Sequence, residues 1–287
     1  MKPPPFDYVA PATLEAALET LAQYGDDAQP LAGGQSLAAM LALRVARPSV
    51  LVDLNRIPEL TGIDDAADGL RVGAMTRQVA VLNSEKVRAR LPSLAAATSL
   101  VGHFQTRNRG TIGGSVSLAD PAAENPAFAL AMNAEMELRN AKGSRKVAAV
   151  NFFDGPYTTA RQGDELLTSI TYRPSPGARI GVDEIARRPG DFAMTGFVAR
   201  LNVKDGKIDE AGFAWFGMAS QPLRAPSAEA SLKGVALKDI DIRAVAHAAV
   251  DDTDPNDDHH ASAEYRKKAG RVLAERVLTK LLMSEAA

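Results

Sequence analysis

The 287-residue sequence contains no cysteine. Without thiolates the chain can form no disulfide, no thiol nucleophile and no cysteine-ligated iron–sulfur cluster. Any such cluster that serves this protein must therefore be carried by another chain. The absence of cysteine also fits a reducing compartment, and we expect the protein in the cytoplasm.

Long hydrophobic runs and a strong net charge are missing as well. No apolar stretch approaches the ~20 residues that a membrane-spanning helix needs, and residues 1–21 lack the apolar centre of a secretory signal. The 33 lysines and arginines nearly balance 35 acidic residues. We therefore expect no membrane span and no nucleic-acid partner.

Several catalytic and metal-binding patterns are absent too. Neither a Ser, His and Asp order nor a carboxylate pair indicates a catalytic constellation, so no catalytic residue is assigned. Residues 251–260, DDTDPNDDHH, contain alternating acids, but Pro255 interrupts them and the glycine of a calcium loop is missing. A charged surface loop is the favoured interpretation, and no metal ligand is predicted.

The patterns that are present mix helices with strands. Apolar residues at helical spacing predict a helix that follows Thr13 and ends at Gly25, and a long helix over 265–283. The clearest predicted strands comprise residues 50–54, 166–172, 197–203 and 208–218. This mixture indicates the α+β class, and the prolines within 174–176 mark a linker.

Two short segments each combine adjacent glycines with hydroxyl or amide side chains. They are LAGGQS at 31–36 and TIGGS at 111–115. Adjacent glycines let successive backbone N–H groups turn into one concavity, and an anion can approach closely where no Cβ projects. The two segments together can clamp a diphosphate from two sides. Neither matches a standard phosphate motif such as GxGxxG or GxxxxGK[ST].

The residues alone leave alternatives open. Each glycine pair taken singly also fits a plain turn, and residues 107–126 fit a surface loop because they are rich in glycine and small polar residues. Arg107 and Arg109 either neutralise a diphosphate or are simply solvated.

The same two segments resemble the FAD loops of the molybdenum hydroxylase flavoproteins. This family includes the medium subunits of carbon monoxide dehydrogenase, quinoline oxidoreductase and caffeine dehydrogenase, and the FAD domain of xanthine dehydrogenase. Further matching segments follow in order along the whole chain: FDY at 6–8, LVDLNRIPEL at 51–60, VGAMTR at 72–77, ADPAAE at 119–124, ARRPGDFAM at 186–194 and SAEYRKKAGRVL at 262–273.

The resemblance implies a fold in three parts. A two-subdomain PCMH-type FAD-binding domain is expected over 1–174, with subdomains at about 1–55 and 56–174. An α+β C-terminal domain of the carbon monoxide dehydrogenase flavoprotein type, with a small antiparallel sheet and helices, is expected over 178–287.

The resemblance also implies the residues that bind FAD. Glu124 stands where relatives usually carry an Asp near the adenosine, and Asp120 is the competing acid. Phe192 stands where many relatives carry Tyr, and its ring can pack on the isoalloxazine. The full expected set is Ala32, Gly33, Gly34, Gln35, Ser36, Thr111, Ile112, Gly113, Gly114, Ser115, Asp120, Glu124, Leu167, Asp191 and Phe192.

The function that the resemblance implies is electron transfer through FAD. The expected partners are a large molybdopterin-binding subunit and a small subunit with two iron–sulfur clusters, assembled as a dimer of heterotrimers. Electrons would reach FAD from the clusters and leave to an external acceptor. The alternatives are a stand-alone FAD oxidoreductase related to the UDP-N-acetylenolpyruvylglucosamine reductases, and an assembly scaffold without flavin. No added substrate domain is evident for the first, and the intact glycine pairs argue against the second.

Overall fold

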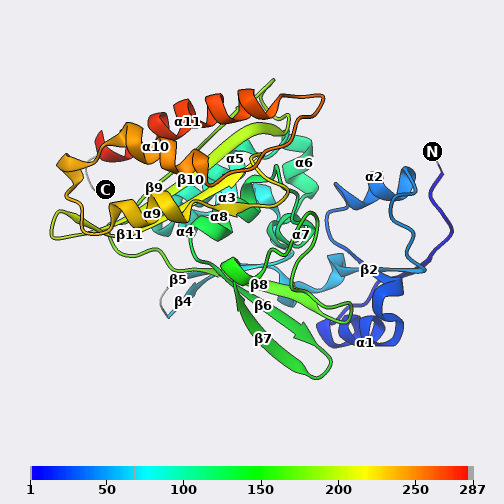
Figure 1. Cartoon of the computed structure of the whole chain (residues 1–287). Helices are drawn as coiled ribbons and strands as arrows, with labels where there is room; N and C mark the ends of the chain where they lie inside the picture. The colour runs from blue at the N-terminus through cyan, green and yellow to red at the C-terminus, as the bar shows by residue number, and fades with distance from the viewer. Residues whose placement is uncertain (1, 68, 284–287) are drawn as a thin grey trace.

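The computed structural model of this chain describes residues 2–67 and 69–283. Within these residues the strands form sheets of three, five and four strands. The N-terminal sheet and its helices lie to one side in Figure 1, while the four-stranded sheet lies beneath the long C-terminal helix. Short helices fill the space between the five-stranded and four-stranded sheets. No helix in the described part of the chain has the length and apolarity to cross a membrane.

The N-terminal part is a small parallel sheet with helices. Its strands are β1 (Asp7–Val9), β2 (Ala28–Leu31) and β3 (Val50–Asp53), and its helices are α1 (Leu14–Tyr24) and α2 (Leu37–Ala42). β3 lies between the other two strands. The predicted first helix is confirmed: Thr13 accepts a hydrogen bond from the Ala16 backbone at 3.2 Å, and Gly25 ends the helix with φ of 53°.

The middle part pairs an antiparallel sheet with six helices. The strands are β4 (Ile63–Ala66), β5 (Gly69–Gly73), β6 (Glu135–Asn140), β7 (Gly143–Ala148) and β8 (Leu166–Tyr172), in the order β4-β5-β8-β6-β7. The helices are α3 (Gln78–Asn83), α4 (Glu85–Arg90), α5 (Pro92–Leu100), α6 (Phe104–Arg109), α7 (Ile112–Leu118) and α8 (Glu124–Ala131).

The surface-loop interpretation of residues 107–126 is wrong, because α6, α7 and α8 occupy most of this segment. Thr111 caps α7, and the side chains of Ile112 and Val116 lie in the main hydrophobic core. Every residue of α8 is buried. A glycine-rich segment can therefore be helical when its neighbours supply a cap and apolar contacts.

The C-terminal part is an antiparallel sheet covered by helices. Its strands are β9 (Arg179–Ala186), β10 (Ala193–Lys204), β11 (Lys207–Phe216) and β12 (Leu223–Arg224), and its helices are α9 (Pro226–Leu232), α10 (Ile242–Asp251) and α11 (Ala263–Met283). Alternate residues of β10 face opposite layers. Phe197 and Leu201 pack with Trp215 under these helices, whereas Val198 belongs to the core that contains α8.

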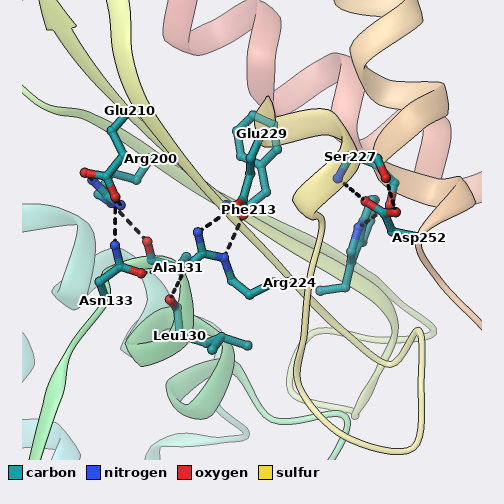
Figure 2. A network of polar contacts seen from close by, with 12 residues as sticks. Leu130, Ala131, Asn133, Arg200, Glu210, Phe213, Arg224, Ser227, Glu229 and Asp252 are labelled. Atoms are coloured by element: carbon teal, nitrogen blue, oxygen red, sulfur yellow. Dashed lines mark hydrogen bonds and ion pairs between the residues drawn. The ribbon is translucent and has the colours of Figure 1, made fainter. Parts of the chain in front are cut away.

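Two arginines join this sheet to the end of α8 (Figure 2). Arg200 donates to the Ala131 carbonyl oxygen at 3.0 Å, and Arg224 donates to the Leu130 carbonyl oxygen at 3.2 Å. The last carbonyls of a helix have no intrahelical partner and carry the negative end of its dipole, so cationic donors suit them. Each guanidinium is also paired with a carboxylate at 2.7 Å, that of Glu210 or Glu229.

Arg200→Met should lower the free energy of unfolding by roughly 1–3 kcal/mol, because the buried Ala131 carbonyl loses this donor. Urea denaturation of the flavin-free chain measures the change. Arg243→Met is the control, since Arg243 lies on the exposed face of α10 without a hydrogen bond or ion pair in the described ranges. Equal stability of the two variants would show that the Arg200 contact does not stabilise the fold.

Candidate functional site

A cavity of about 490 Å³ brings the two glycine segments together. Its volume lies within the range of about 300–1,000 Å³ usual for ligand sites. Of the residues expected to bind FAD, these line it: Ala32, Gly33, Gly34, Gln35, Ser36, Thr111, Gly113, Gly114, Ser115, Asp120, Glu124, Leu167 and Phe192. Residues from β2 to the C-terminal sheet thus converge on one space.

Two of the expected residues do not line the cavity. The side chain of Ile112 is fully buried in the core, and its backbone N–H donates to the Thr76 carbonyl at 3.0 Å. Asp191 is exposed in the turn before β10, where its N–H donates to the Arg188 carbonyl at 3.1 Å. Ile112 therefore anchors the second segment, and Asp191 lies beside the wall formed by Phe192.

The first glycine segment presents a run of free backbone donors. Gly34 adopts a left-handed conformation with φ of 71°, and Gln35 folds back to donate to the Gly33 carbonyl at 3.1 Å. The backbone N–H groups of residues 33–37 donate to no acceptor in the described part of the chain. Consecutive N–H groups around a left-handed residue form a concavity that suits an anion.

The second glycine segment differs from this expectation, because most of its donors are already used. Gly113 donates to the Ala74 carbonyl at 2.8 Å, and Gly114 donates to the Thr111 hydroxyl at 3.0 Å. The segment is therefore fixed to the end of β5 and capped as the start of α7. Its glycines therefore contribute room for a ligand to approach closely, and they contribute no free N–H groups.

The glycines also let the two segments touch. A Cβ on Gly33 would lie 2.1 Å from the Arg109 carbonyl oxygen and 2.9 Å from the Gly110 Cα. A Cβ on Gly114 would lie 3.3 Å from that of Ala32 and 2.7 Å from the Thr111 hydroxyl. Backbone meets backbone at Gly33, whereas Gly114 faces the side chains of Thr111 and Ala32. Both glycines are therefore required by packing as well as by ligand approach.

The two arginines that flank the second segment do not line the cavity. Arg107 turns away and donates to the Val101 and Gly102 carbonyls at 2.8 and 2.7 Å. The Arg109 side chain is exposed at the end of α6. This placement favours the alternative in which neither guanidinium neutralises the diphosphate directly.

An acidic pair, Glu124 and Glu184, lies where α8 meets the C-terminal part, and of the two only Glu124 lines the cavity. Burial raises the pKa of Glu124, at the start of α8, to about 7, and the neighbouring Asp120 carboxylate adds to the rise. Burial and the charge of Glu124 raise the pKa of Glu184, in β9, to about 8. The Glu184 Oε2 atom is buried without a hydrogen-bond partner among the described residues. Near neutral pH these carboxyl groups therefore hold protons that exposed glutamates would have lost.

Asp120 is held differently from Glu124. It accepts from the Ala122 backbone at 2.9 Å and from the Tyr157 hydroxyl at 3.3 Å. Burial is the largest influence on Asp120 and raises its pKa, while these two hydrogen bonds oppose the rise. Since both acids line the cavity, each is placed to accept a hydrogen bond from a ligand hydroxyl.

Sequence reasoning missed several lining residues, among them Met75, Gln78, Tyr157 and Arg161. The Oε1 atom of Gln78 is buried and has no hydrogen-bond partner within the described ranges. Met75 lies in the VGAMTR segment that resembles the family, so the sequence did contain a signal that could have identified it as a lining residue. Tyr157 adopts a left-handed backbone with φ of 53°, which no local pattern indicated.

Comparison with known proteins decides the family. The model for the FAD binding domain in molybdopterin dehydrogenase matches residues 4–172, and the model for the CO dehydrogenase flavoprotein C-terminal domain matches residues 182–281. The chain belongs to the medium-subunit family of molybdenum hydroxylases. FAD is its cofactor, and the chain is an oxidoreductase subunit.

Relatives in this medium-subunit family match over nearly their whole length. The glyceraldehyde dehydrogenase medium chain of Sulfolobus acidocaldarius is 37% identical over 95% of this chain and 97% of its own. Subunit alpha of the 6-hydroxypseudooxynicotine dehydrogenase complex of Paenarthrobacter nicotinovorans is 39% identical over 98% and 96%. A carbon monoxide dehydrogenase chain of Hydrogenophaga pseudoflava superimposes with a TM-score of 0.94 at 36% identity, covering 98% of both chains. The expected resemblance and α+β architecture are confirmed.

The cavity fits FAD in its chemistry. Free N–H groups at residues 33–37 suit a diphosphate, and the carboxyls of Asp120 and Glu124 suit ribose hydroxyls. Apolar lining by Leu167 and the ring of Phe192 suits the isoalloxazine.

Gly33→Ala should abolish FAD retention, because the added Cβ collides with the Arg109 carbonyl and forces the two segments apart. Flavin absorbance per purified chain measures the loss. Gly206→Asn is the control: Gly206 lies in the β10–β11 turn with open space around it, and Asn tolerates its φ of 73°. Full FAD occupancy in a folded Gly33→Ala chain would contradict this account, and we expect the same loss for Gly33→Val and Gly114→Val.

Glu184→Gln should flatten the pH dependence of stability. The folded pKa values of Glu124 and Glu184 lie above the ordinary value of 4.5, so the folded chain binds more protons than the unfolded chain from about pH 4.5 to 8. Stability therefore falls as pH rises through this window. Removing one titrating group should make the variant more stable than wild type at pH 8 and equal to it near pH 5.

Thermal unfolding of the flavin-free chain at a series of pH values measures this effect. Glu59→Gln, at an exposed position whose side chain makes no hydrogen bond or ion pair among the described residues, should follow the wild-type profile. Parallel profiles for wild type and Glu184→Gln would contradict a raised pKa at Glu184.

Proposed function

We propose that this chain takes electrons from iron–sulfur clusters of a partner subunit and passes them to an external acceptor. The observation that supports this most is the single cavity lined by both glycine segments, in a chain that matches medium subunits end to end. The named relatives are medium chains or subunits of dehydrogenases and hydroxylases, which belong to multisubunit complexes. When bound, FAD supplies a carrier that accepts electrons at one side and releases them at another.

The chain's own residues bind, orient and shield the cofactor. When FAD is bound, the first segment, residues 32–36, would hold the diphosphate with its free backbone N–H groups from Gly33 onward, and residues 111–115 would form the opposing wall. Glu124 would accept a hydrogen bond from a ribose hydroxyl, with Asp120 as the competing acid. Leu167 and the exposed ring of Phe192 would pack against the isoalloxazine, while Asp191 supports that wall from the adjoining turn. No residue of the chain is assigned a catalytic proton transfer, since an electron relay needs none.

The proposal includes the rest of the assembly. The partners are a large molybdopterin-binding subunit, where substrate is oxidised, and a small subunit with two iron–sulfur clusters, in a cytoplasmic dimer of heterotrimers. We also propose two domains, at 1–174 and 178–287, of which the first has subdomains at about 1–55 and 56–174. The stand-alone reductase alternative is not favoured, because the chain is similar to medium chains over nearly their whole length.

Complexes that lack this subunit should still reduce their clusters with substrate, while turnover with the physiological acceptor falls. Rapid mixing of substrate with such complexes, followed at cluster wavelengths, measures the first step. Adding back the FAD-loaded chain should restore turnover. The isolated chain alone should oxidise no organic substrate, because substrate oxidation is proposed on the molybdopterin-binding subunit and the sequence has no cysteine to ligate a cluster. Loss of cluster reduction itself would place the chain at substrate oxidation and overturn the proposal.

A further inference from the structure

Two segments that carry the family resemblance, LVDLNRIPEL and VGAMTR, contain polar residues without an assigned role. Asn55 follows β3, and Arg77 immediately precedes α3. Neither side chain lines the cavity, although the neighbouring residues Leu54 and Gln78 do. The hydrogen bonds of these two side chains show which backbone groups they bind.

Asn55 binds the carbonyl that precedes Gly33. Its Nδ2 atom donates to the Ala32 carbonyl oxygen at 2.9 Å, and its Oδ1 atom accepts from Arg77 Nη2 at 2.5 Å. Asp53 accepts from the Asn55 backbone N–H at 2.9 Å, which fixes the start of this turn. Both ends of the amide are used, so its orientation is determined by its partners.

Arg77 binds the carbonyl that precedes Gly110. While one terminal nitrogen donates to Asn55, the other donates to the Arg109 carbonyl oxygen. A continuous series of hydrogen bonds therefore runs from the Ala32 carbonyl through two side chains to the Arg109 carbonyl. These are the backbone positions beside the contact of Gly33 with residues 109 and 110.

This series of hydrogen bonds holds the two glycine segments together, and the contact at Gly33 stops them from moving any closer. The free N–H groups of residues 33–37 begin one residue after the carbonyl held by Asn55. We propose that Asn55 and Arg77 are positioning residues for FAD, which hold the two glycine segments at the separation that the diphosphate requires. The inference rests on the proposed assignment of these segments to the diphosphate. Asn55 is exposed, so its loss should affect this geometry more than the core.

Titration of the full-length, flavin-free chain with FAD tests the proposal. Asn55→Ala and Arg77→Ala should each raise the Kd for FAD by about tenfold or more, since each breaks the series at a charge-assisted hydrogen bond. The unfolding midpoint of the flavin-free chain should stay at the wild-type value. The double variant should bind about as weakly as either single variant, because both residues act through one series.

Two further variants separate positioning from charge. Arg56→Ala removes an exposed positive charge beside Asn55 that makes no hydrogen bond or ion pair in the described part of the chain, and should leave the Kd unchanged. Asn55→Asp keeps an acceptor for Arg77 but loses the donor to Ala32 and to the Asp53 carboxylate, and should weaken binding at least as much as Asn55→Ala does.

The proposal is overturned if the Asn55 and Arg77 variants bind FAD normally, if their losses add in the double variant, or if Arg56→Ala weakens binding equally. A loss that only follows a lowered unfolding midpoint overturns it as well. Gly33→Ala in the same titration distinguishes a failure of this positioning role from a failure of the diphosphate assignment. A loss there with normal binding by Asn55→Ala and Arg77→Ala leaves the diphosphate assignment standing, whereas normal binding by Gly33→Ala refutes that assignment.

Discussion

The contact between the Gly33 backbone and the backbone of Arg109 and Gly110 is the constraint on which the site depends. A single Cβ at residue 33 would lie 2.1 Å from a carbonyl oxygen that cannot move without α6. Because the first segment belongs to the parallel sheet and the second to the helical layer, this contact joins two separately built parts of the chain. At this contact the two parts meet backbone to backbone, and the cavity lies beside it.

The sequence predicted the elements whose signals are local. Thr13, the apolar spacing after it and Gly25 specify α1, and the two glycine pairs identify the walls of the site. It did not reveal α7, because Gly113 and Gly114 resemble a loop until the Thr111 cap and the contact with Ala74 are known. The Ala74 contact comes from a distant part of the chain, so no window of sequence around α7 contains it.

The interaction between Glu124 and Glu184 is likewise invisible in the sequence, because the two residues are far apart along the chain. The family resemblance of its segment predicts Glu124 at the site, but nothing near it in sequence indicates Glu184 in β9. The sheet of the C-terminal part brings the second carboxyl to α8, and Arg200 and Arg224 bind the opposite end of that helix. One short buried helix therefore receives one acid at its start and two cations at its end from the same neighbouring sheet.

The unequal hydrogen bonding of the two glycine segments bears on how the protein matures. Amides in the second segment are satisfied by the chain itself, so this wall forms with the rest of the core during folding. Amides at residues 33–37 donate to no acceptor among the described residues, so they stay available to a ligand. The chain can thus complete its core first and load its cofactor afterwards. In hydrogen exchange, the wall at residues 112–114 belongs to the protected core, while the segment at 33–37 acquires protection only with cofactor insertion.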